Sequence, residues 1–173
     1  TISRYVTGIG ESAFANCEWL TNVNFDAENC EDMDEDVFVY AGTKQGGITV
    51  NFGTMVTRVP ANMFFSSKGD VNLYEIKFQG DVCTSIGKNA FAMTEGLEKV
   101  TLPDSITTIE ENAFEGSKYY DDNNNWVNGV LYINNCLIKA KSSIVSGTYA
   151  INNRTIMIAD GAFLDCKYLT VIS

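Results

Sequence analysis

The chain has 173 residues, of which 45% are hydrophobic and 20% are charged, as in a globular protein with a continuous core. Its formal net charge of −10 repels phosphate backbones and anionic lipid, so we expect no nucleic-acid partner and no membrane insertion. The absence of histidine excludes Ser–His–Asp and Cys–His catalytic systems within this chain.

A short phrase that ends in phenylalanine recurs along the chain. It is clearest at the first, fourth, fifth and last copies, and two degenerate copies lie between the first and the fourth. The six anchors are Phe14, Phe38, Phe64, Phe91, Phe114 and Phe163. Their spacings are 24, 26, 27, 23 and 49 residues. The last spacing is about two units long but holds one anchor, which predicts an insert there.

A second pattern follows each anchor, in which apolar residues alternate with polar ones as in a strand with one buried face. In chain order it predicts strands at residues 23–25, 50–52, 76–78, 100–102 and 149–151. A unit of this length cannot bury its own apolar side, so neighbouring units must stack into one core. We therefore expect the five strands to form one parallel ladder in chain order.

The insert covers residues 118–148. Two apolar runs in it, residues 130–133 and 137–139, flank Asn134 and Asn135, which tolerate the positive φ of a tight turn. This arrangement predicts a β-hairpin. We expect the hairpin to project from the edge of the solenoid; it either reads a ligand or caps and widens the core.

Five cysteines are present, and four of them occupy repeat positions where other units have small or apolar residues. We therefore interpret Cys17, Cys30, Cys83 and Cys166 as core residues. An odd count, no C-x-x-C spacing and no histidine argue against a zinc site. Cys136 lies outside the repeat and is the cysteine that we would test for reactivity.

Acidic residues cluster before the second anchor, at Glu28, Glu31, Asp32, Asp34, Glu35 and Asp36. Met33 interrupts the cluster and no glycine is available for the turn of a calcium loop, so we interpret it as a solvated turn. Residues 121–125 form a polar loop, where calcium is the lesser alternative. The adjacent pair Glu110 and Glu111 is expected on an exposed face, not in a glycosidase site. We expect no cofactor and no metal.

Three stretches identify a resemblance to a known family: Ile86 to Phe91, Leu97 to Ile109, and insert residues 129–141. They closely resemble the BspA-type leucine-rich repeat, and the likeness extends over essentially the whole chain, with residues 26–75 least regular. The resemblance implies a leucine-rich-repeat solenoid: a right-handed β/α superhelix of short parallel strands with mostly irregular or short helical connections. It also implies an extracellular or cell-surface protein that adheres to host proteins or to other cells.

We therefore predict one solenoid domain over residues 1–173 with about six repeats, monomeric and part of a longer protein whose flanking repeats or caps are missing. The predicted function is non-enzymatic binding or adhesion, with a host or neighbouring-cell surface protein or a glycan as partner. The alternative is a passive spacer that presents other domains.

Two groups of residues are candidates for ligand contact. The strand residues that point away from the core carry no aromatic side chain and suit broad, weak adhesion: Asn22, Asn24, Thr49, Asn51, Glu75, Lys77, Lys99 and Thr101. The aromatic residues of the insert suit a strong local contact, because binding hot spots favour such side chains: Tyr119, Tyr120 and Trp126.

Overall fold

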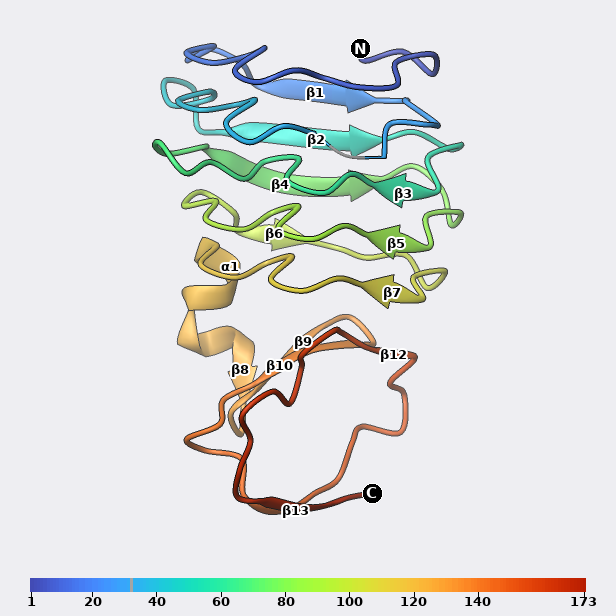
Figure 1. The fold of residues 1–173 in the computed structure, drawn as a ribbon, viewed down its shortest axis with the longest axis vertical. Coiled ribbons are helices and arrows are strands. Elements are labelled where there is room, and N and C mark those ends of the chain that lie inside the picture. Colours follow the sequence, from blue (N-terminus) through green and yellow to red (C-terminus); the bar gives the residue numbers. More distant parts are fainter. Residues whose placement is uncertain (32) are drawn as a thin grey trace.

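Successive coils of the chain stack along one long axis in the computed structural model, and the strands lie across that axis (Figure 1). The structure describes residues 1–31 and 33–173; Asp32, which belongs to the acidic cluster, lies outside the described residues. Among the described residues, helix is limited to α1 (Lys118–Asp121) and the 3₁₀ turn η1 (Asn123–Asn125). No helix within the described ranges is long and apolar enough to cross a membrane. The predicted solenoid is confirmed.

Four strands form the main parallel sheet, in the order β1 (Asn22–Phe25), β2 (Ile48–Phe52), β4 (Leu73–Phe78) and β6 (Lys99–Val100). Val50 is the register partner of Val23 and of Ile76, and Ile76 also pairs with Val100. Alternate residues along β2 are buried, so one face of this sheet lies on the core. The first four strands of the predicted ladder, and their order, are confirmed.

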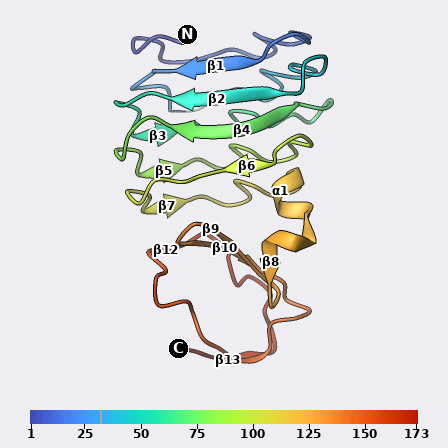
Figure 2. The same cartoon turned by 180° about the vertical axis from the view of Figure 1, so that it is seen from behind.

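The prediction for the fifth strand is wrong. β11 (Gly147–Tyr149) pairs in parallel with β13 (Leu169–Ile172) in a separate sheet and not with β6. After Phe114, the positions that would form the next strand fall in α1 and η1 instead. Ser117 caps α1 by accepting a hydrogen bond from the Tyr120 backbone N–H at 3.2 Å, and α1 lies beside β6 (Figures 1 and 2). The helix thus ends the ladder.

A second parallel sheet joins β3 (Arg58–Val59), β5 (Ser85–Ile86) and β7 (Thr108–Ile109). Val59 pairs with Ile86 and Ile86 with Ile109, so the apolar residues five places before the third, fourth and fifth anchors lie in this sheet. Sequence reasoning found these apolar positions but not the sheet, because two-residue strands leave no alternating pattern to read.

The residue two places before each anchor has a positive φ in all six units. These residues are Ser12, Asp36, Asn62, Asn89, Asn112 and Gly161. A left-handed backbone crowds the Cβ atom, and Asn, Asp and Gly tolerate it better than other residues. The recurrent small or polar residue at this position therefore turns the chain into the core.

Stacked phenylalanine rings form the centre of the core. The ring centroids of Phe14 and Phe38 lie 5.1 Å apart, those of Phe38 and Phe64 4.7 Å, and those of Phe91 and Phe114 5.3 Å. Phe163 contacts Tyr149 instead, at 5.8 Å, within a second, smaller core cluster. The insert therefore separates the last anchor from the stack.

The insert contains an antiparallel hairpin of β9 (Val130–Ile133) and β10 (Cys136–Ala140), flanked by β8 (Trp126–Val127) and β12 (Met157–Ile158). The expectation that this hairpin projects is wrong. Residues on both of its faces are buried, including Val130, Leu131 and Leu137, which are at most 1% exposed. A hairpin with apolar side chains on both faces must be covered on both faces. This hairpin therefore packs between the Phe114 coil and the last coil.

Candidate functional site

The outward side chains of the main sheet form the surface that we call the strand face: Asn22, Asn24, Thr49, Asn51, Glu75, Lys77, Lys99 and Thr101. Strand register places Asn22, Thr49, Glu75 and Lys99 in one column across the four strands. Asn24, Asn51 and Lys77 form the next column. Seven of the eight residues that the sequence proposed as a face are thus brought together by the strand register, and Thr101 follows directly after β6.

Contacts between neighbours order the strand face. The Asn51 Nδ2 atom donates a hydrogen bond to Asn24 Oδ1 at 3.1 Å, across β2 and β1. Lys77 Nζ lies 2.8 Å from Glu75 Oε2 on the same strand. These links hold long polar side chains in place at an exposed surface, where each such pair contributes little to stability.

Tyr74 belongs to this surface, although sequence reasoning placed no aromatic residue there. β2 pairs Ile48 with Leu73 and then Thr49 with Glu75, so Tyr74 is the extra residue of a β-bulge. Lys99 Nζ lies over the Tyr74 ring at 5.1 Å from its centroid. Gly47 has a φ of +97°, and a Cβ atom there would lie 2.8 Å from the Tyr74 Cβ. The bulge and this glycine give the ring its place beside the columns.

An open groove of about 530 Å³ crosses β4 and β6. Its lining includes the polar residues Asn51, Glu75, Lys77, Gln79, Lys99 and Thr101. Asp81 and Pro103 lie at the end where the strands turn away from the sheet. Five members of the strand face therefore share one concave surface.

The aromatic residues of the insert are engaged in packing. Tyr120 and Trp126 meet edge to face with centroids 5.1 Å apart, and Trp126 Nε1 donates to the Tyr120 carbonyl oxygen at 2.6 Å. Lys141 Nζ lies 4.3 Å from the centroid of the Trp126 ring. Burial raises the pKa of the Tyr119 and Tyr120 phenols. All three aromatic residues are half-buried against the main core and form no projecting contact.

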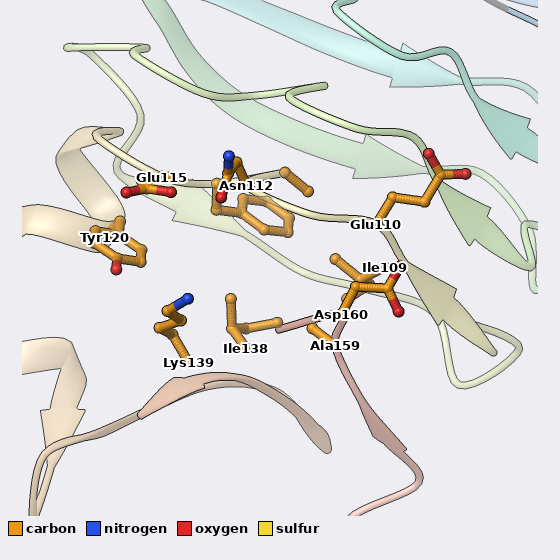
Figure 3. Close-up of a pocket in the computed structure, with 11 residues that line it drawn as sticks. Ile109, Glu110, Asn112, Glu115, Tyr120, Ile138, Lys139, Ala159 and Asp160 are labelled. Atoms are coloured by element: carbon orange, nitrogen blue, oxygen red, sulfur yellow. The ribbon is translucent and has the colours of Figure 1, made fainter. Parts of the chain in front are cut away.

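Where the Phe114 coil meets the hairpin, the structure encloses a small cavity of about 20 Å³ (Figure 3). Lys139 and Ile138 from β10 lie on one side and Glu110 on the other. Lys139 Nζ donates to the Gly161 carbonyl oxygen at 3.0 Å. A space of this size holds about one water molecule, so it is a packing defect at the junction and not a ligand site.

The prediction that the repeat cysteines are core residues holds for the interior coils and fails at both ends. Cys30 and Cys83 are buried as predicted, but Cys17 is exposed and Cys166 only half-buried, because both lie near the ends of the stack. Cys136, the cysteine that we would test for reactivity, is buried. Burial raises the pKa of the Cys136 thiol to about 11, which suppresses the reactive thiolate.

The acidic cluster contains a buried carboxylate and is not wholly solvated. Asp36 is 2% exposed, and its Oδ1 atom accepts hydrogen bonds from Ser66 Oγ at 2.7 Å and from the Ser67 N–H at 2.8 Å. Lys68 Nζ lies 3.0 Å from Asp36 Oδ2 and 2.6 Å from Glu11 Oε1. Burial raises the pKa of Asp36, but these hydrogen bonds outweigh it and lower the value to about 2. Asp36 and Lys68 together therefore link three coils.

Metal-binding side chains do not gather in the part of the chain that the structure describes, where no group of three or more acidic, cysteine or histidine residues could hold an ion.

Comparison with known proteins identifies the repeat. The sequence profile of the BspA type leucine rich repeat region matches residues 1–121 in six copies. No curated protein and no solved structure matches the chain significantly. The profile match ends at the last residue of α1, the helix that ends the strand ladder. The chain therefore belongs to the family of BspA-type leucine-rich-repeat proteins.

Proposed function

We propose that this chain is a non-catalytic binding module of a secreted or surface-exposed protein, and that it contacts its partner through the strand face. The observation that carries the proposal is the continuous register of polar side chains across four parallel strands, while the alternate residues lie in the core. A solenoid presents such a surface without gaps, and extended surfaces of this kind suit large partners.

Family membership supports the class of function. BspA-type repeat proteins are associated with cell surfaces and are typically non-enzymatic. The partner that we propose is a protein or glycan on a host cell or a neighbouring cell. The net charge of −10 disfavours nucleic acid and anionic lipid as partners.

The strand face takes precedence over the insert as the contact surface. Trp126 donates its indole N–H to the Tyr120 carbonyl and lies under Lys141, so its interactions are already satisfied within the chain. Lys77 on β4 and Lys99 on β6 are exposed members of the strand face. Reversing their charge changes that surface without touching the core.

Two variants test the proposal: Lys77→Glu with Lys99→Glu on the strand face, and Trp126→Ala in the insert. Lys44→Glu with Lys167→Glu is the matched control, because it reverses two exposed lysines elsewhere. Labelled protein is applied to cultured epithelial cells and to immobilised extracellular-matrix proteins. We expect the strand-face variant to lose binding and the control to keep it. Should both test variants bind like the parent, a passive spacer is the better description.

A further inference from the structure

We infer that the groove across β4 and β6 binds a neutral oligosaccharide, with the ring of Tyr74, which lies beside the groove under Lys99, as an adjacent stacking surface. This inference rests on the proposed function, because it names the ligand class of the strand face. Three observations carry it: the balance of charge in the groove, the kind of hydrogen-bonding groups that line it, and the position of Tyr74.

Charge in the groove is balanced. Glu75 and Asp81 contribute two carboxylates, and Lys77 and Lys99 contribute two ammonium groups. Lys77 pairs with Glu75 at 2.8 Å, so part of this charge is compensated locally. In a chain of net charge −10, the groove is therefore a nearly neutral region. Neither a polyanion nor a polycation is favoured there, whereas a neutral ligand is not repelled.

The polar groups of the groove suit hydroxyl groups. Asn51, Gln79 and Thr101 each offer both hydrogen-bond donors and acceptors. The lysines add donors alone, and the carboxylates add acceptors alone. A sugar hydroxyl donates and accepts at once, so it can bridge such neighbours. A groove of about 530 Å³ also falls within the range of about 300–1,000 Å³ that is usual for small-ligand sites.

Tyr74 adds the apolar contact that a sugar ring needs. It sits in the β-bulge next to Glu75, and its ring lies under Lys99, which lines the groove. Lys99 Nζ lies over the Tyr74 ring, so a ligand reaches that ring face only by displacing the exposed Lys99 side chain. Tight contacts between proteins usually depend on Trp, Tyr and Arg side chains. Neither Trp nor Arg is among the residues that line the groove, so an oligosaccharide fits it better than a protein partner.

The test uses the intact chain on an array that carries short neutral oligomers of hexoses and N-acetylhexosamines beside their sialylated and sulfated counterparts. We expect binding to neutral members. Tyr74→Ala and Asn51→Ala should each weaken it by about tenfold or more, which corresponds to about 1.4 kcal/mol. Tyr74→Phe should retain it, because the ring is kept. Tyr168→Ala, which removes an exposed tyrosine of the last coil, is the matched control and should bind like the parent.

Thermal melts of each variant check that the chain remains folded. Asn51→Ala removes a half-exposed amide and its surface hydrogen bond to Asn24, so it serves as the second test if Tyr74→Ala unfolds. Binding restricted to sialylated or sulfated members overturns the inference, as does neutral binding that survives both substitutions. If no glycan binds but the strand-face lysine variant still loses cell binding, the inference fails and the proposed function stands. If neither assay responds to strand-face variants, both fail.

Discussion

The residue two places before each repeat phenylalanine has a left-handed backbone conformation, so the stability of the solenoid depends on which side chain stands there. Asn112 is an exposed example with a φ of 60°. Asn112→Val places a β-branched side chain in a conformation that it tolerates badly, and we expect a loss of about 1–2 kcal/mol in the free energy of unfolding. Asn112→Gly should leave stability nearly unchanged. Chemical denaturation of the two variants checks this, and equal losses would contradict it.

Asp36 shows how a single carboxylate can bind neighbouring coils together. Its pKa is lowered to about 2 from an ordinary value of 3.8, so the ionised form is favoured in the folded state. A depressed folded pKa contributes stability above the ordinary pKa, and this contribution is lost as the pH falls from about 4 to about 2. We expect the parent to lose about 1–2 kcal/mol over this window from Asp36.

Asp36→Asn should remove that part of the pH dependence and lower stability at neutral pH. Glu35→Gln is the control, because Glu35 is the exposed neighbour in the same cluster. The measurement is urea unfolding at several pH values between 2 and 7. The same acid-induced loss in parent and Asp36→Asn would show that the buried carboxylate does not contribute in this way.

Thiol accessibility follows burial in this chain and not position in the repeat. Cys17 is exposed, whereas burial raises the pKa of both the Cys83 and the Cys136 thiols to about 11. We expect an alkylating reagent at neutral pH to modify Cys17 first and to reach Cys83 and Cys136 only after denaturant is added. Peptide mapping by mass spectrometry identifies the modified residues. Early modification of Cys136 would contradict the burial of the hairpin.

Among the elements, the phenylalanine stack contributes most to the core. Phe91 is fully buried, between Phe64 at 6.3 Å and Phe114 at 5.3 Å. Phe91→Ala should lower the free energy of unfolding by roughly 3–5 kcal/mol, because the neighbouring rings cannot close the cavity. Lys88→Ala removes only an exposed ion pair with Glu111 and should cost under about 0.5 kcal/mol. Similar melting temperatures for the two variants would refute the placement of Phe91 in the core and of Lys88 at the surface.

Sequence periodicity predicted the repeating elements well but not where the repetition stops. Residues 149–151 carry the same alternation as the strands of the main ladder, so the pattern alone joins them to it. What separates them is local: after Ser117 the chain forms α1 beside β6, and a four-residue helix has no periodic signal of its own.

Tyr74 was missed for a related physical reason. Strict alternation back from Ile76 assigns residue 74 to the buried face, and only a bulge moves it to the outer one. The burial of Asp36 was also beyond local patterns, because the groups that compensate its charge lie about 30 residues further along the chain, at Ser66 and Lys68. Features that depend on a partner in another coil leave no trace in the spacing of residues.

For the whole molecule, stability should vary along the stack. Interior coils have a neighbour on each side, and end coils have one. β2 and β4 lie between other strands, whereas β13 pairs only with β11 and includes Val171 and Ile172, which are about half exposed. We expect amide protons of β2 and β4 to exchange slowest and those of β13 fastest, as measured by hydrogen–deuterium exchange. Uniform protection along the chain would contradict this nearest-neighbour picture.

The orientation of the strands decides how the chain responds to mechanical load. Strands lie across the long axis, so the hydrogen bonds that join one coil to the next run along it (Figure 1). A force applied to the two ends therefore peels the coils apart one at a time and does not shear a whole sheet at once. A coil of about 24 residues releases about 80 Å of extended chain when it detaches. We therefore expect a partner held by an inner coil to stay bound while the outer coils unwind under load.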